Sequence, residues 1–214
     1  MDTGRKAEPQ RAAPRLYLVT APVADAPTCA GELGAALKAA DVAAVLVRLA
    51  AGDERTQINR VKTMAATVQN VGAAMLLDGH VEIVARAGAD GAHLTGIEAF
   101  QTALGRLRPQ RLAGCGGLAT RHDAMLAAEG GADYVMFGEP EADGQRPSFD
   151  AVLDRVSWWA EVFEIPCVGY AANLDEVEAL AQAGADFVAV GDAMWRDAAV
   201  LEEAGRRLTV TEPV

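Results

Sequence analysis

The 214-residue chain is 51% hydrophobic, contains only 5% aromatic residues and carries a formal net charge of −11 at pH 7. This length can bury a substantial core within one domain, and the acidic balance argues against nucleic acid or anionic membranes as partners, because both attract basic surfaces. Its three cysteines show neither a disulfide framework nor a zinc-ligand spacing, and no segment resembles a signal peptide or a membrane span. We therefore expect a cytoplasmic protein with a flexible tail over residues 1–14 and one domain over residues 15–214.

Short apolar runs alternate with longer helical patterns from residue 15 onward. The runs suit strands that are buried on both faces, and the longer segments show helical periodicity. In chain order, the expected elements are a strand at Arg15–Thr20 and a helix at Cys29–Ala40, then Val42–Leu49 and Arg55–Val71, Ala73–Asp78 and His80–Ala87, Gly91–Leu94 and Ile97–Leu107, Arg111–Gly116 and Thr120–Gly130, Tyr134–Gly138 and Phe149–Phe163, Pro166–Tyr170 and Leu174–Ala183, and Phe187–Gly191 and Asp197–Leu208.

One phrase joins helix to strand three times. Copies stand at Ala87–Leu94, Gly130–Phe137 and Ala183–Val190, each with a glycine suited to a left-handed helix end, followed by alanine, aspartate and an apolar run. Because each strand is followed by its own helix, the pattern predicts an α/β fold, a single-domain (β/α)8 TIM barrel. A doubly wound open sheet is the alternative, although no dinucleotide fingerprint or phosphate loop is present.

In their order, several of these segments resemble the thiamine phosphate synthase family and its relative, the thiazole tautomerase. The resemblance rests on Leu16–Thr20, Val45–Arg48, Gly88–Leu94, Ala132–Gly138 and Ala183–Val190. It implies a barrel, often dimeric, that joins a pyrimidine methyl diphosphate to a thiazole phosphate with Mg²⁺ and releases pyrophosphate. The resemblance thus predicts a small-molecule ligand at the C-terminal mouth of the barrel, and it allows a homodimer.

Cation and metal positions of the family are only partly retained. Arg48 matches the arginine on strand two, whereas Asp78-Gly79-His80 stands where the family has Asn-Asp-Arg. Glu98 stands at the family's second carboxylate. By this resemblance, Arg48 and His80 are candidate catalytic residues, and Asp78 and Glu98 are candidate Mg²⁺ ligands. The alternative for Asp78 is a helix N-cap.

Around the expected phosphate site the chain departs further from the family. Gly116 and Gly117 replace a Ser-Thr-His or Ser-Val-His motif, an acidic loop from Glu139 replaces a threonine-rich one with a lysine, and new side chains stand on the last two strands. We expect the added β-carbons and carboxylates to obstruct or repel phosphate. The candidate substrate-binding residues are Arg48, Gly116, Gly117, Glu139, Tyr170, Ala171, Ala172, Gly191 and Asp192.

Two smaller interpretations concern individual residues. Asp192 is alternatively a helix N-cap, and the acidic run of Glu139, Glu141 and Asp143 is alternatively a solvated loop. His93 is expected to be structural, and His122 to lie in the first turn of a helix capped by Thr120.

Three functional hypotheses remain open from the sequence. One is a thiamine phosphate synthase with weakened or lost activity. The second is a non-catalytic barrel, a pseudoenzyme that binds a small molecule or a protein partner. The third is a repurposed enzyme whose acidic pocket takes a neutral or cationic ligand, with Tyr170 available to stack on a ring.

Overall fold

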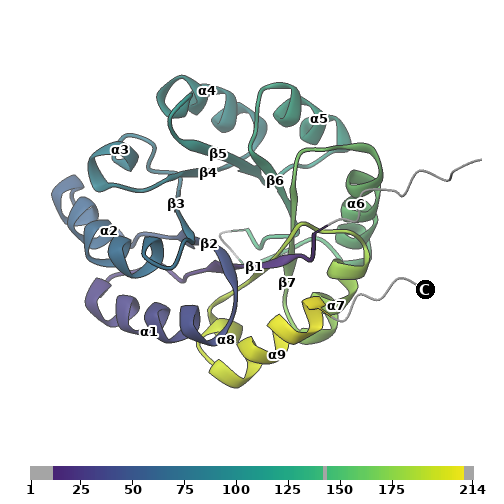
Figure 1. Ribbon diagram of the computed structural model, residues 1–214. Coiled ribbons are helices and arrows are strands. Elements are labelled where there is room, and N and C mark those ends of the chain that lie inside the picture. Colours follow the sequence, from purple (N-terminus) through teal and green to yellow (C-terminus); the bar gives the residue numbers. More distant parts are fainter. Residues whose placement is uncertain (1–11, 142–143, 210–214) are drawn as a thin grey trace, which may run out of the picture.

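The computed structural model describes residues 12–141 and 144–209, within which eight parallel strands close into one barrel in the order β1 to β8 (Figure 1). Each strand pairs with its neighbours in sequence, and β1 also pairs with β8, where Leu18 lies opposite Val190. The (β/α)8 prediction is confirmed, and the open-sheet alternative is wrong. The strands are β1 (Arg15–Val19), β2 (Val42–Val47), β3 (Ala74–Asp78), β4 (Gly91–Thr95), β5 (Leu112–Gly116), β6 (Tyr134–Phe137), β7 (Cys167–Ala171) and β8 (Phe187–Val190).

The helices form an outer ring around these strands (Figure 1). Polar side chains cap several of them at the start, and the first turn of the helix that contains His122 has the expected capping box between Thr120 and Asp123. The helices are α1 (Ala26–Ala39), α2 (Glu54–Gln69), α3 (Val84–Ala87), α4 (Ile97–Leu107), α5 (Arg121–Glu129), α6 (Phe149–Val162), α7 (Leu174–Gln182), α8 (Asp192–Trp195) and α9 (Ala198–Thr209).

The repeated helix-to-strand phrase has one repeated structural role. Its glycines at positions 88, 131 and 184 all have positive φ, as the sequence predicts. Its aspartates do something that spacing alone did not reveal, since each carboxylate accepts a hydrogen bond from a backbone N–H of the preceding strand. Asp90 binds Met75 N at 2.7 Å, Asp133 binds Ala113 N at 2.7 Å, and Asp186 binds Cys167 N at 2.8 Å. The phrase thus ends a helix and ties neighbouring strands together at the bottom of the barrel.

Strand alternation divides the core into two layers. A large outer layer lies between the strands and the helices, and a smaller inner cluster fills the barrel. The inner strand faces of β4 and β5 carry His93, Gly114 and Gly116, where most other strands carry aliphatic or tyrosine side chains. A β-carbon built on Gly114 would lie 2.0 Å from the ring of Tyr134, so the glycines leave room for large polar side chains from neighbouring strands.

Two helices differ from the expectation. The helix expected from His80 begins only at Val84, because Gly79 and His80 have φ values of 69° and 47° and so cannot form its first turn. A short extra helix, α8, begins at Asp192, directly after its N-cap residue Gly191. The N-cap interpretations of Asp78 and Asp192 are therefore both wrong: Asp78 ends β3, and Asp192 is the first residue inside α8.

Other expectations concern the chain as a whole. None of the helices in the described part of the chain is long and apolar enough to cross a membrane. All three cysteines are buried, and burial raises the pKa of Cys115 to about 12. The expected tail falls largely on residues 1–11, and Asp143 of the acidic run also lies outside the described residues.

Candidate active site at the mouth of the barrel

A cavity of about 620 Å³ opens at the carboxyl ends of the strands. In barrels of this class, side chains at these strand ends and in the loops that follow them carry the chemistry. Its walls are formed by residues on the inner faces of β1 to β4 and β6 and by the loops that follow the strands in sequence. The lining residues are Val19, Pro22, Leu46, Arg48, Leu49, Asp78, His80, His93, Thr95, Gly117, Met136, Glu139, Pro140 and Glu141.

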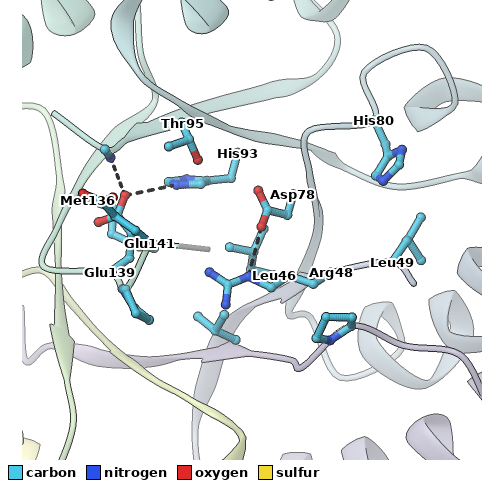
Figure 2. A pocket seen from close by; sticks show the side chains of 14 residues that line it. Leu46, Arg48, Leu49, Asp78, His80, His93, Thr95, Met136, Glu139 and Glu141 are labelled. Carbon is cyan, nitrogen blue, oxygen red and sulfur yellow. Dashed lines mark hydrogen bonds and ion pairs between the residues drawn. The ribbon is translucent and has the colours of Figure 1, made fainter. Parts of the chain in front are cut away.

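An ion pair between two predicted site residues lies on one wall of this cavity. Arg48 Nε donates to Asp78 Oδ2 at 3.0 Å, and the two side chains are 29% and 30% exposed (Figure 2). The backbone N–H of Arg48 in turn donates to Thr20 Oγ1 at 3.0 Å, which ties the start of this loop to the end of β1. Because Asp78 binds Nε, the fork of terminal nitrogens is held towards the cavity, where it suits a phosphate group.

A buried chain of polar side chains runs up the axis of the barrel to the cavity floor. The hydroxyls of Tyr17 and Tyr134 lie 2.8 Å apart, and the Tyr134 hydroxyl lies 3.0 Å from His93 Nδ1. Burial raises the pKa of both tyrosines well above 10, so both phenols are neutral at physiological pH. His93, expected to be structural, therefore both packs in the core and presents its second ring nitrogen to the cavity.

This tyrosine chain predicts a loss of stability at high pH. The folded-state pKa of Tyr17 lies above its unfolded value near 10, so its contribution is complete below pH 10 and falls as the pH rises, because the unfolded chain ionises first. At pH 10.5 the free energy of unfolding should fall by about 1 kcal/mol for each such tyrosine relative to pH 8. Urea unfolding of Tyr17→Phe at both pH values should show a smaller loss than wild type. Equal losses would contradict this account.

Glu139 closes the cavity over β5. Its Oε1 accepts a hydrogen bond from the backbone N–H of Gly117 and lies 3.8 Å from His93 Nε2 (Figure 2). A β-carbon at Gly116 would lie 1.9 Å from this oxygen, so the absence of a side chain there is what admits the carboxylate. The space that Gly116 leaves is thus filled by Glu139 and His93.

His80 lines the cavity but stands apart from the other polar groups. Figure 2 shows it beyond Asp78, on the far side from His93. Its Nδ1 lies 3.6 Å from Oε1 of Glu82 in its own loop. The structure supplies no partner for His80 from the Arg48 and Asp78 pair, and its catalytic role stays a prediction.

Of the two expected metal ligands, one lies at the cavity. Asp78 lines the wall, whereas Glu98 is exposed in the first turn of α4 and is not among the lining residues. Among residues 12–141 and 144–209, no group of three or more His, Cys, Asp or Glu side chains is placed to hold a metal ion. Asp78 therefore stays a candidate Mg²⁺ ligand at the cavity, whereas Glu98 lies outside its lining, and both assignments stay predictions.

The residues expected to bind phosphate on β7 and β8 lie outside the cavity lining. Ala171 packs in the outer core against the helices, so the interpretation that its β-carbon obstructs a phosphate is wrong. Tyr170 packs against the inner cluster, and its hydroxyl takes the space beside Gly191, where a β-carbon would lie 2.3 Å from it. Burial raises the pKa of Tyr170, which stays a neutral phenol.

At the same end of the barrel, carboxylates accept hydrogen bonds from backbone N–H groups. Glu176 Oε2 accepts from Ala172 N at 2.8 Å and pairs with Arg146 Nη2 at 2.7 Å. Asp192 Oδ1 accepts from the N–H of Ala21 at 2.9 Å, and its Oδ2 lies 2.6 Å from Arg196 Nε. The charge of Asp192 is thus compensated within the chain, which weakens the expected repulsion of phosphate by this residue.

The sequence did not reveal His93 as a cavity residue, and it did not single out Tyr134. Strand alternation carried the signal, because on β4 it places His93 and Thr95 on the inner face, in register with Asp78 and Gly116 of the neighbouring strands. By the same alternation, Arg48 lies on the inner side of the barrel, because it stands two residues beyond Leu46 of the inner cluster.

The chain is similar in sequence to known proteins. The family model described as thiamine monophosphate synthase matches residues 16–194. The thiamine-phosphate synthase of Rhodospirillum centenum is 35% identical over 184 residues, which cover 85% of this chain and 89% of the relative. That of Hyphomonas neptunium is 32% identical over 189 residues, which cover 85% and 86%.

Solved structures share the fold. The thiamine phosphate pyrophosphorylase from Pyrococcus furiosus superposes with a TM-score of 0.74 at 21% identity, covering 92% of this chain and 96% of that chain. The 3-hexulose-6-phosphate synthase from Salmonella typhimurium reaches 0.68 at 17% identity, covering 90% and 98%. The match of the family model over most of the barrel, with two relatives above 30% identity along nearly their whole length, decides the assignment. This chain belongs to the thiamine monophosphate synthase family.

Proposed function

We propose that the cavity carries out the joining reaction that the family resemblance implies, at a rate lowered by the changed residues around the mouth. In this reaction the bond between the pyrimidine methylene carbon and a diphosphate oxygen breaks, and pyrophosphate leaves with the electron pair. The thiazole nitrogen then donates its lone pair to that carbon and forms the new C–N bond, which gives thiamine phosphate. The observation that carries the proposal is the Arg48 and Asp78 pair on the cavity wall of a chain that matches the family.

Arg48 would act on the leaving group. Negative charge accumulates on the departing diphosphate as the C–O bond breaks, and a guanidinium already fixed in place stabilises that charge without reorganising. Asp78 fixes it through Nε, which leaves the terminal nitrogens to contact two phosphate oxygens. Asp78 is thus a positioning residue for Arg48.

Asp78 also fits as a ligand for Mg²⁺. This ion commonly binds through one or two carboxylates together with substrate phosphates, so a single carboxylate on the wall is a sufficient protein contribution. Bound there with the substrate, Mg²⁺ would neutralise part of the diphosphate charge.

The proposal is tested by mixing purified protein, both family substrates and Mg²⁺, and measuring thiamine phosphate by chromatography. We expect product, and a rate about tenfold lower for Asp78→Asn, which keeps the shape of the side chain but removes its charge. Asp150→Asn, an exposed aspartate in the first turn of α6, is the matched control and should keep the wild-type rate. Absence of product from the wild-type protein would refute the proposal.

A second candidate is a non-catalytic barrel that binds a small molecule. It is favoured by one observation: carboxylates of the chain itself accept hydrogen bonds from backbone N–H groups just after β5, β7 and β1, where an anionic substrate would compete with them. A ligand that binds only the folded state raises the melting temperature. A rise with either substrate, without product, would select this function.

A further inference from the structure

His93 presents a buried nitrogen to the cavity that has no hydrogen-bond partner. The side chain is 2% exposed, and its Nε2 lies 3.8 Å from the nearest Glu139 oxygen, beyond hydrogen-bond distance. Burying a polar atom without a partner costs roughly 1–3 kcal/mol, so such atoms in a cavity wall are suited to receive a ligand. Figure 2 shows the ring edge directed towards Glu139.

The tyrosines beneath decide which proton this nitrogen carries. If Tyr17 donates to Tyr134 and Tyr134 donates to His93 Nδ1, every buried hydroxyl proton is used and the histidine proton resides on Nε2. The reverse direction would leave the Tyr17 proton without an acceptor and turn the Nε2 lone pair towards a carboxylate. The first arrangement is therefore favoured, and Nε2 is a donor facing the cavity.

A second donor faces the same place. The backbone N–H of Gly117 points at Glu139 Oε1, the oxygen that also lies nearest His93 Nε2. Since Gly116 has no side chain, an oxygen atom can approach both donors closely. Tethered to the end of β6, the Glu139 carboxylate satisfies the Gly117 donor but leaves the His93 donor unsatisfied.

We propose that His93 Nε2–H and Gly117 N–H form a binding subsite for a phosphoryl oxyanion, and that the carboxylate of Glu139 is its intramolecular occupant. A phosphoryl group presents several oxygens around one centre and can meet both donors at once, which Glu139 does not. Glu139 thus excludes anions that bind weakly to the two donors, because a ligand must displace its carboxylate to bind. The inference rests on the proposed function only in taking a phosphoryl group as the natural occupant.

Binding of inorganic pyrophosphate, measured by isothermal titration calorimetry without Mg²⁺ or the second substrate, tests the proposal. Glu139→Ala vacates the subsite and should bind pyrophosphate at least tenfold more tightly than wild type. Glu139→Gln keeps an amide oxygen that can accept from Gly117 N–H, so its gain should stay below threefold. Because turnover is not measured, a failed synthase assay and a failed binding test are separate results.

Two further variants separate occupancy from simple charge repulsion. Glu141→Ala removes the same charge from the same cavity, yet no hydrogen bond or ion pair joins the Glu141 side chain to either donor, so its gain should also stay below threefold. In the double variant Glu139→Ala/His93→Gln, the gain in pyrophosphate affinity should be lost. Circular dichroism and melting curves confirm folding, with Glu139→Ser as a second truncation. No gain in folded Glu139→Ala and Glu139→Ser, an equal gain in Glu139→Gln or Glu141→Ala, or a gain that survives His93→Gln would overturn the proposal.

Discussion

Arg48→Ala is expected to lower kcat/KM for thiamine phosphate formation by about 10²- to 10³-fold, the range found when one preorganised donor to a developing anion is removed. The guanidinium that Asp78 holds at the cavity wall is the cation that the proposed function assigns to the departing pyrophosphate. Its loss also leaves the Asp78 carboxylate unpaired beside that anion. Single-turnover rates with both substrates and Mg²⁺ measure the effect on the chemical step.

Two arginine variants serve as controls for this loss. Arg48→Lys keeps the charge but not the planar fork, so it should recover only part of the activity. Arg86→Ala removes an arginine of α3 whose partner is Glu54 and whose side chain is more than half exposed, so it should keep the wild-type rate. If kcat/KM of Arg48→Ala lies within threefold of the wild-type value, Arg48 does not stabilise the leaving group.

The sequence was sufficient for the fold because its signals are local. Each Gly-Ala-Asp joint combines a glycine that ends a helix with a strand that begins three residues later, and all three joints lie as expected. The elements that differ are the ones whose limits depend on backbone conformation. His80 takes a positive φ that its residue type does not signal, and α8 is a four-residue helix, too short to show periodicity.

The site was harder to predict, because its groups meet across strands. Sequence matching placed Arg48, Asp78 and Glu139 at strand ends, and they do line one cavity. It did not reveal that Glu139 turns inward onto Gly117, since that depends on the missing side chain at Gly116 of a neighbouring strand. Contacts of this kind are set by the register of the closed barrel, which no single segment encodes.

Among the changed positions around the mouth, Glu139 is one whose carboxylate lies in the cavity wall. Sequence comparison placed the changes at the acidic loop from Glu139 and at Ala171, Ala172 and Asp192, whereas in the structure Ala171 faces the helices and Asp192 is paired with Arg196. The carboxylate of Glu139 lies over β5 and β4, hydrogen-bonded to Gly117 N–H and 3.8 Å from His93 Nε2. Activity changes should therefore track substitutions at Glu139 more closely than those at Asp192.

For stability, the largest loss is expected at one of two adjacent tryptophans of α6. Trp159 is fully buried, stacks on Phe163 with ring centroids 4.1 Å apart, and donates from Nε1 to the carbonyl of Ile165 at 2.7 Å. Trp159→Ala would leave a large cavity and remove the donor to that carbonyl, which should lower the free energy of unfolding by about 3–5 kcal/mol. Against a typical total of about 5–15 kcal/mol, this is enough to threaten folding at 37 °C.

Trp158 is the matched control, because it differs from Trp159 by one position and therefore by one face of the helix. It is half-buried, and the guanidinium of Arg121 covers its ring at 4.7 Å. Its truncation to alanine should cost only about 1–2 kcal/mol, since solvent can refill the space. Unfolding in guanidinium chloride, followed by far-ultraviolet circular dichroism, compares the two variants without relying on tryptophan fluorescence. A Trp158→Ala protein as unstable as Trp159→Ala would mean that the outer face of α6 is buried against another surface in solution, since the packing within one chain does not account for such a cost.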